Sequence, residues 1–425
     1  MREYAVVLLT AALVTFLTTP VVRMVAIRLG MMAAPRERDV HVIPTPRGGG
    51  VAMYLGVSAA ILVATRLPAL QRTFDDSETI AVLVAGGLIC LLGVLDDRWG
   101  LDALTKLTGQ IASAGVMVLL GVQLAFLFLP VADIGTISLG PDVGVPLTIL
   151  LTVLTVNALN FIDGLDGLAA GVSAIAALAF FAYSYHLGLV GYDDVASAPA
   201  LITAVLAGAC LGFLPHNFSP ARIFMGDSGS MLVGLMLSAA AVTATGGVDP
   251  QSFDSAASLL PLALPLLVPI AILFIPFIDL VMAVIRRTRR GQSPFSPDKM
   301  HLHHRLLSIG HSHRRAVLVM YFWAALLSFG AVALSITGGR AELVVVIAVL
   351  LVVGVVVVLS PRARRAAREA RAAELMAQRE RSRADHPTAR AVRPTGTAPG
   401  AGTVSATGPA AVPPPAERAA GTVLR

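Results

Sequence analysis

The sequence contains little charge and few cysteines. Asp, Glu, Lys and Arg make up 14% of its 425 residues, whereas a soluble domain carries about 25%. Hydrophobic residues make up 56%, which excludes an ordinary soluble domain, a disordered chain and a fibrous protein. The two cysteines, Cys90 and Cys210, both lie in apolar runs. We therefore expect them to be packing residues, and a disulfide scaffold is excluded.

Long apolar runs take the place of charge. A helix that crosses a membrane needs about 20 mostly apolar residues. Eleven predicted spans cover residues 4–22, 50–66, 79–95, 104–121, 144–160, 166–186, 198–215, 228–246, 259–285, 316–337 and 341–360. The first follows a single Arg but lacks a clear small-residue cleavage site, so we expect it to be retained. The sequence predicts an all-α polytopic membrane protein.

The distribution of basic residues predicts the orientation of these spans. With the N-terminus outside, 28 of the 32 Lys and Arg residues fall on the cytoplasmic side and four fall outside. Without the C-terminal tail the counts are 16 and 4. This bias follows the positive-inside rule. The net charge of +6 therefore reflects membrane orientation, with a cytoplasmic C-terminus, and predicts no nucleic-acid partner.

The composition changes near residue 360. Residues 1–360 form the predicted transmembrane domain, and residues 361–425 form a cytoplasmic tail. The tail begins with an Arg/Ala/Glu segment at 361–383, which suits a short helix on the membrane surface. The rest is rich in Ala, Pro, Gly and Thr and cannot bury a core. We expect this tail to be disordered and to have no chemical role.

Polar residues gather at the predicted cytoplasmic span ends. Arg47 precedes three glycines at the start of the second span, where backbone N–H groups could approach an anion and Arg47 could bind phosphate; a plain Pro/Gly turn is the alternative. Asp96 and Asp97 end the third span and need a cation, a shared proton or a basic partner. Lys106 could be that partner or could bind a substrate phosphate, and a hydrated loop is the alternative.

Four polar residues repeat at intervals of three along the end of the fifth span. They are Asn157, Asn160, Asp163 and Asp166, and they share one face if this stretch is helical. Polar groups at the end of an apolar span are costly unless they are used. Helix capping would explain one of them, not four, so a functional interpretation is favoured.

The fourth polar cluster contains Asn217, Phe224 and Asp227. Asp227 precedes the start of the eighth span, so helix capping is a serious alternative for it, although capping explains neither Asn217 nor Phe224. The fifth cluster runs from Arg286 and Arg287 to Asp298, His301, His303 and His304. Its histidines suit a zinc site or phosphate binding. Asp279 either pairs with Arg286 or Arg287 or faces the site.

All five clusters fall on one membrane face under this orientation. Together they supply carboxylates for a divalent cation, basic groups for phosphates and glycines for close approach. Hard oxygen ligands favour Mg²⁺ or Mn²⁺, and phosphoryl transfer needs this combination. A site at the bilayer edge predicts a lipid-borne substrate. A transporter of a phosphorylated solute is the alternative, but it would place polar groups near the midplane.

The motifs resemble those of the polyprenyl-phosphate N-acetylhexosamine-1-phosphate transferases over about residues 1–335. The resemblance is carried by PTPRGG at 44–49, the pair Asp96–Asp97, NFIDGLDG at 160–167, FMGDSGS at 224–230 and DKMHLHHRL at 298–306. It is nearer to the branch that uses UDP-N-acetylglucosamine. The branch that makes the first lipid of peptidoglycan from UDP-MurNAc-pentapeptide has Thr-Met-Gly-Gly in place of Pro-Arg-Gly-Gly, His-His-His in place of His-Leu-His-His, and a lysine with no equivalent here.

The resemblance implies a reaction in a bacterial plasma membrane. Undecaprenyl or decaprenyl phosphate would attack the β-phosphate of UDP-GlcNAc, with Mg²⁺ or Mn²⁺ as cofactor, and give polyprenyl-diphospho-GlcNAc and UMP. It leaves a homodimer open, and phospho-MurNAc-pentapeptide transfer is the alternative. The implied metal ligands are Asp227 and Asp96. The implied catalytic residues are Asp96, Asp97, Asp163, Asp166 and His301. The implied substrate contacts are Arg47, Lys106, Asn160, Asn217, Phe224, Arg287, His303 and His304.

Overall fold

The computed structural model describes residues 1–33, 44–128, 136–190, 196–246, 270–289, 311–337 and 340–356, with isolated positions 306, 358 and 376. The helices are α1 (Arg2–Arg28), α2 (Gly49–Ala64), η1 (Pro68–Phe74), α3 (Glu78–Trp99), α4 (Ala103–Leu119), α5 (Pro141–Ile162), α6 (Leu168–Leu189), α7 (Ala198–Asn217), α8 (Gly226–Gly246), α10 (Phe274–Arg289), α12 (His313–Thr337) and the helix Ala341–Val356. Two short antiparallel hairpins pair β1 (Met32–Ala33) with β2 (Thr45–Pro46) and β3 (Phe126–Phe128) with β4 (Thr136–Ser138).

Seven of the described helices are long and apolar enough to cross a membrane: α1, α3, α5, α6, α7, α8 and α12. The number is eight if α2 and η1 form one span, bent by 111°. The helices α4 and Ala341–Val356 are apolar but shorter. The predicted span 259–285 overlaps α10, but its first eleven residues lie outside the described part. The predicted all-helical membrane architecture is therefore confirmed, apart from the two hairpins.

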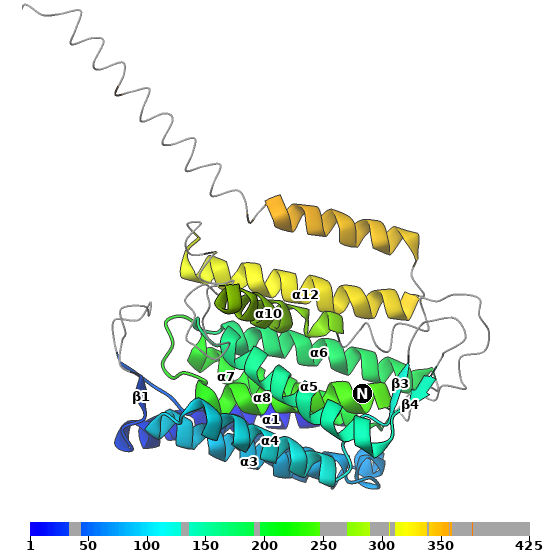
Figure 1. Ribbon diagram of the computed structural model, residues 1–425, viewed down its shortest axis with the longest axis horizontal. Coiled ribbons are helices and arrows are strands. Elements are labelled where there is room, and N and C mark those ends of the chain that lie inside the picture. The colour runs from blue at the N-terminus through cyan, green and yellow to red at the C-terminus, as the bar shows by residue number, and fades with distance from the viewer. Residues whose placement is uncertain are drawn as a thin grey trace, which may run out of the picture. The chain divides into compact units, whose positions relative to one another are not determined.

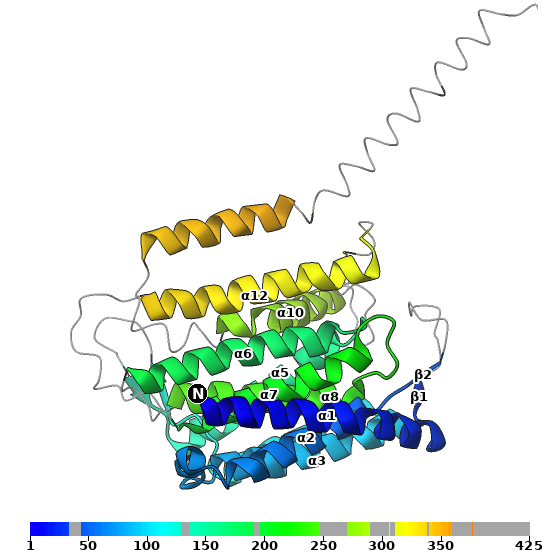
Figure 2. The ribbon, with the colours of Figure 1, turned by 180° about the vertical axis from the view of Figure 1, so that it is seen from behind.

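The chain divides into two compact units, Met1–Arg365 and Ala366–Arg425. Within the first unit the helices run side by side, with α6, α10 and α12 toward one flank and α3 and α4 toward the other (Figures 1 and 2). The centre is formed by α7 and α8, which are the most buried of the candidate spans. The predicted tail lies outside the described residues except for Met376.

Small residues allow the central helices to pack closely. A Cβ atom added to Gly208 of α7 would lie 2.1 Å from the Leu8 carbonyl oxygen of α1, and one added to Gly212 would lie 2.1 Å from the Ala12 carbonyl oxygen. Because lipid and leucine are equally apolar, close van der Waals packing of this kind is a principal force between membrane helices. The glycines therefore set the distance between α1 and α7.

A proline in α1 gives this contact a polar component. Pro20 has no N–H to donate to the carbonyl of Phe16, one turn earlier. The Nε2 atom of His216, at the end of α7, lies 3.1 Å from that carbonyl oxygen, and its ring packs on the Phe16 ring. His216 thus satisfies the carbonyl that Pro20 leaves free and fixes the end of α7 beside the loop that leads into α8.

Candidate functional site

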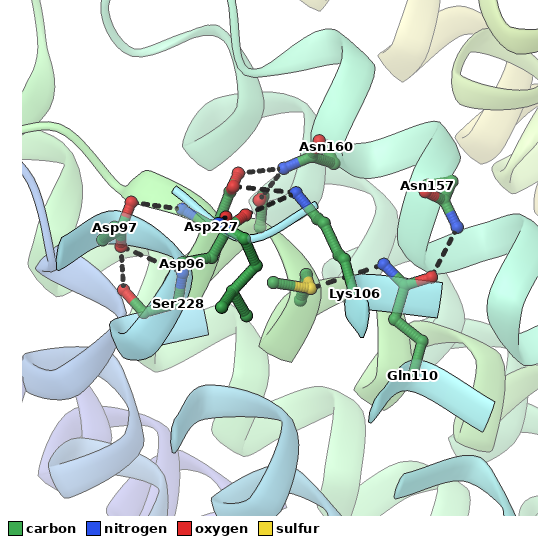
Figure 3. Close-up of polar contacts among 11 residues, drawn as sticks. Asp96, Asp97, Lys106, Gln110, Asn157, Asn160, Asp227 and Ser228 are labelled. Carbon is green, nitrogen blue, oxygen red and sulfur yellow. Dashed lines mark hydrogen bonds and ion pairs between the residues drawn. The ribbon is translucent and has the colours of Figure 1, made fainter. Parts of the chain in front are cut away.

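The start of α8 is capped by a carboxylate from α3. Oδ1 of Asp97 accepts a hydrogen bond from the Asp227 backbone N–H at 2.9 Å, and Oδ2 accepts from the Ser228 N–H at 3.2 Å and the Ser228 hydroxyl at 2.9 Å (Figure 3). The first N–H groups of a helix have no partner within the helix and carry partial positive charge. Asp97 therefore fixes the backbone of Asp227 relative to α3.

The side chain of Asp227 shares a lysine with Asp96. Nζ of Lys106, on α4, lies 2.8 Å from Oδ2 of Asp227 and 2.9 Å from Oδ2 of Asp96. The other oxygen of Asp96 accepts from the Leu101 N–H at 2.7 Å. Two roles were left open for Lys106, and the structure shows it in the first of them, as the basic partner of the carboxylates. The alternative in which Asp227 caps its own helix is wrong, because Asp97 does this instead.

Asparagine side chains on α5 extend this network. Nδ2 of Asn160 donates to Oδ1 of Asp227 and, at 2.9 Å, to the Ser230 hydroxyl. One turn earlier, Nδ2 of Asn157 donates to Oε1 of Gln110 at 2.8 Å (Figure 3). Asn160 was expected to contact substrate, and in the structure it holds one oxygen of Asp227 while Lys106 holds the other.

Asp163 and Asp166 were expected to share one face if their stretch were helical, and the structure shows that it is not. Helix α5 ends at Ile162, and residues 163–167 form a turn that closes at Gly167, whose φ is +75°. Glycine adopts this left-handed conformation without the cost that a side chain brings, so the turn can form where the helical spacing continues in the sequence. Asp166 is buried, and its Oδ2 accepts from the Ala221 N–H at 3.0 Å in the loop before α8.

Asp163 lies in the electrostatic field of the other acids. Burial and the negative charges of Asp227 and Asp97 raise the pKa of its carboxyl group to about 7, while the positive charge of Arg47 acts in the opposite direction. Charges act on one another over short distances inside a protein. The first, second, third and fourth sequence clusters therefore meet at one end of the helix bundle.

Two of the glycines after Arg47, Gly49 and Gly50, pack helices together and do not offer free N–H groups. The N–H groups of Gly49 and Gly50 donate at 3.1 Å to the carbonyl oxygens of Phe224 and Met225. A Cβ atom added to Gly50 would lie 2.2 Å from the backbone nitrogen of Gly229. The alternative in which these two N–H groups bind an anion is therefore wrong, because the backbone before α8 takes them.

The remaining predicted residues are placed less directly. Asn217 is buried; its Oδ1 accepts from the Gly167 N–H at 3.1 Å and its Nδ2 donates to the Ile223 carbonyl at 3.0 Å. The Arg287 guanidinium lies 5.0 Å from the ring centroid of Phe161, beside Asn160 in the sequence. The half-buried Phe224 lies in the loop before α8. His301, His303, His304 and Asp298 lie outside the described residues.

Three site residues were missed in the sequence. Ser228 and Ser230 bond to Asp97 and Asn160, and Gln110 bonds to Asn157. The serines lie one and three residues after Asp227 and were passed over as part of a helix start. Gln110 lies four residues after Lys106, on the same face of α4, and a buried amide in an apolar helix could have signalled it.

The carboxylates suit a cation that is also held by its substrate. Within the described ranges, no group of three or more His, Cys, Asp or Glu side chains is placed to hold a metal ion. Mg²⁺ does not need such a cage, because it binds through one or two carboxylates, waters and substrate phosphates. Asp96 and Asp227, which already share one cation in Lys106, fit that pattern.

Acids and a lysine gathered at the helix ends of a membrane bundle suit a membrane-embedded phosphotransferase, which needs charge stabilisation and positioning. Comparison with known proteins agrees: residues 79–245 match the model of glycosyl transferase family 4. The chain is 54% identical, over 83% of its length and 87% of the relative, to the decaprenyl-phosphate N-acetylglucosaminephosphotransferase of Mycolicibacterium smegmatis. It is 53% identical, over 83% and 88%, to the protein of the same name from Mycobacterium tuberculosis H37Rv. It is 32% identical, over 79% and 86%, to the probable undecaprenyl-phosphate N-acetylglucosaminyl 1-phosphate transferase of Bacillus subtilis. The chain belongs to glycosyl transferase family 4, and the predicted family resemblance is confirmed.

Proposed function

We propose that this protein transfers N-acetylglucosamine-1-phosphate from UDP-GlcNAc to a polyprenyl phosphate and releases UMP. The single observation that carries the proposal is the cluster in which Lys106 joins Asp96 and Asp227 at the ends of three helices. The names of the relatives at 51–54% identity support decaprenyl phosphate as the acceptor. The proposal also includes eleven spans, an outside N-terminus and a cytoplasmic site in a bacterial plasma membrane.

The reaction is a direct displacement at phosphorus. An oxygen of the lipid phosphate forms a bond to the β-phosphorus of UDP-GlcNAc, the bond from that phosphorus to the bridging oxygen breaks, and UMP leaves with the electron pair. A phosphate monoester is already largely ionised near neutral pH, so the protein contributes mainly by positioning the reactants and stabilising charge. Neither an enzyme nucleophile nor a strong base is required.

The residues divide this work according to their contacts. Asp227 and Asp96 would hold Mg²⁺, which when bound supplies positive charge to the diphosphate. Asn160 and Asp97 fix Asp227 from two sides, so they orient it. Lys106 keeps two carboxylates close together at low electrostatic cost and carries a charge that a substrate phosphate could use.

The remaining roles stay predictions. Asp163 and Asp166 would act on the nucleotide or metal side, and Arg47 and Arg287 would contact phosphates. Phe224 would stack on the uracil, Asn217 would contact the nucleotide, and His301, His303 and His304 would contact the diphosphate or the sugar. Because Asn217 and Asp166 already bond to backbone groups of the site loops, we expect their substitution to act partly through loop placement.

Parallel assays with three sugar nucleotides test the proposal. Purified protein, Mg²⁺ and decaprenyl phosphate would be incubated with UDP-GlcNAc, UDP-GalNAc or UDP-MurNAc-pentapeptide, and UMP would be measured. UMP release from UDP-GlcNAc that requires both lipid and Mg²⁺ is the expected result. Faster release from UDP-MurNAc-pentapeptide would favour the peptidoglycan branch. Uptake of a phosphorylated solute into vesicles without a new product would favour a transporter.

A further inference from the structure

The turn at residues 163–167 is held by residues that no motif contains. The Asp166 backbone N–H donates to Nε2 of His313 at 3.2 Å, and the Tyr321 hydroxyl donates to the Gly167 carbonyl oxygen. Both partners belong to α12, about 150 residues later in the chain. The turn therefore has two backbone groups fixed by a helix that is distant in sequence.

The start of α12 also holds the loop between α7 and α8. The Arg314 guanidinium donates to the Ser219 carbonyl at 3.0 Å. The Asp166 carboxylate accepts from the Ala221 N–H in the same loop at 3.0 Å. His313 and Arg314 are consecutive, so these bonds close a ring through the turn, the loop and α12. Neither the turn nor the loop can shift without breaking a bond in this ring.

The packing around Tyr321 indicates a built contact. A Cβ atom added to Gly171, in the first turn of α6, would lie 2.0 Å from Oη and from Cζ of Tyr321. One added to Gly167 would lie 3.4 Å from the same hydroxyl oxygen. The tyrosine ring thus fills the space that these two glycines leave, and its hydroxyl reaches a backbone carbonyl at the end of the turn.

We propose that His313 and Tyr321 are positioning residues that hold the turn 163–167, and with it the carboxylate of Asp163, in the active site. The inference rests on the proposed function. Gly164 and Gly167 give the turn backbone freedom that external bonds must remove. A displacement of about 1 Å in a catalytic group can lower a rate by roughly 100-fold, so the turn needs such bonds if Asp163 takes part.

Conservative variants separate positioning from general stability. Tyr321→Phe keeps the ring and removes the hydroxyl, His313→Leu removes the acceptor, and His313→Gln keeps an acceptor at a similar position. The matched control is Tyr54→Phe, because the Tyr54 hydroxyl of α2 also donates to a backbone carbonyl, that of Leu83 at 3.1 Å. Leu83 lies thirteen residues, about 20 Å along α3, from Asp96, so this bond is far from the site.

Two readouts are measured on the full-length protein in detergent. Hydrogen exchange of peptides that cover residues 163–168 reports the turn, and kcat with KM for UDP-GlcNAc reports the site. We expect Tyr321→Phe and His313→Leu to speed exchange in the turn and to lower kcat about tenfold. We expect His313→Gln to restore most of kcat. Tyr54→Phe should shift the melting temperature by a similar amount and leave both readouts unchanged.

Two results would overturn the inference. One is unchanged exchange in the turn of Tyr321→Phe and His313→Leu, and the other is a kcat loss no larger than that of Tyr54→Phe. The exchange measurement needs no substrate. An inactive wild-type protein would therefore contradict the proposed function, whereas unchanged exchange in the variants would contradict the inference.

Discussion

Asp97 accepts a hydrogen bond from the backbone N–H of Asp227, across 130 residues of sequence. Two adjacent acids at the end of α3 thus have different tasks. Asp97 directs its carboxylate at the N-terminus of α8, and Asp96 directs its carboxylate at Lys106. The pair does not act as two equivalent ligands, and substitution of each should have a distinct result.

Asp97→Asn should weaken the start of α8. The asparagine keeps one acceptor oxygen but places an amino group where the Ser228 donors need an acceptor. We expect a loss of about 1–2 kcal/mol in unfolding free energy and reduced activity, both measurable on purified protein. The control is Asp102→Asn: Asp102 caps α4 through the N–H groups of Leu104 and Thr105, and asparagine caps helices as well as aspartate. Equal effects of the two variants would contradict the role of Asp97.

Lys106→Gln should make stability depend on Mg²⁺. Without the ammonium group, Asp96 and Asp227 face each other with no positive charge between them, at a cost of about 2 kcal/mol for this partly buried cluster. A divalent cation can replace the missing charge. We expect a lower melting temperature in EDTA and a larger Mg²⁺-induced rise in the melting temperature than for wild type. A Mg²⁺ response equal to that of wild type would mean that the cation does not bind between these carboxylates.

Gly93→Ala should displace α8 from α3. The added Cβ atom would lie 2.3 Å from Cα and from the backbone nitrogen of Ser228, so the backbone next to Asp227 must move. We expect at least about 2 kcal/mol of destabilisation and a loss of activity. Gly115→Ala in α4 is the matched control, because its Cβ atom meets nothing within 4 Å and alanine favours a helix. Unchanged stability and activity of Gly93→Ala would show that α3 and α8 do not pack against each other at Gly93 as described.

Mg²⁺ affinity should rise with pH through the titration of Asp163. Its pKa is raised to about 7 by burial and by Asp227 and Asp97. Below that pH the metal-free folded protein keeps a proton on the Asp163 carboxyl group, whereas the unfolded chain releases this proton at lower pH. The raised pKa lowers stability as pH rises toward 7. A cation favours the ionised form, and binding should tighten about tenfold from pH 6 to pH 8.

Calorimetric titration with Mg²⁺ at both pH values checks this prediction. Asp163→Asn should remove most of the change in affinity, while Asp76→Asn, which alters an exposed carboxylate before α3, should preserve it. An undiminished pH dependence in Asp163→Asn would assign the titrating group elsewhere.

The sequence was sufficient to predict the helices and most acids of the site, for identifiable physical reasons. Apolar runs of span length have few alternatives to a membrane helix, and ten of the eleven predicted spans coincide closely with described helices. Acids at the end of an apolar run are costly, so Asp96, Asp227 and Asp163 stood out. Their meeting at one end of the bundle followed from counting basic residues.

The details that depend on distant backbone could not be predicted. The spacing of Asp163 and Asp166 suits a helix, yet the glycines beside them allow a turn. The choice between helix and turn depends on two distant partners, helix α12 and the loop that precedes α8. The glycines after Arg47 suited either an anion site or a plain turn, and the carbonyls of residues 224 and 225 exclude the anion site for the N–H groups of Gly49 and Gly50. His313 and Tyr321 carry no signal at all in the sequence, because their partners are backbone groups.

Product stoichiometry with the purified protein tests the central claim most directly. UDP-GlcNAc labelled in the sugar, Mg²⁺ and decaprenyl phosphate would be incubated with wild type and with Asp227→Asn, and UMP and labelled lipid would be quantified together. We expect one UMP for each polyprenyl-diphospho-GlcNAc, no product without lipid, and a rate at least about 100-fold lower for Asp227→Asn. Full activity of Asp227→Asn, or UMP release without a lipid product, would contradict it.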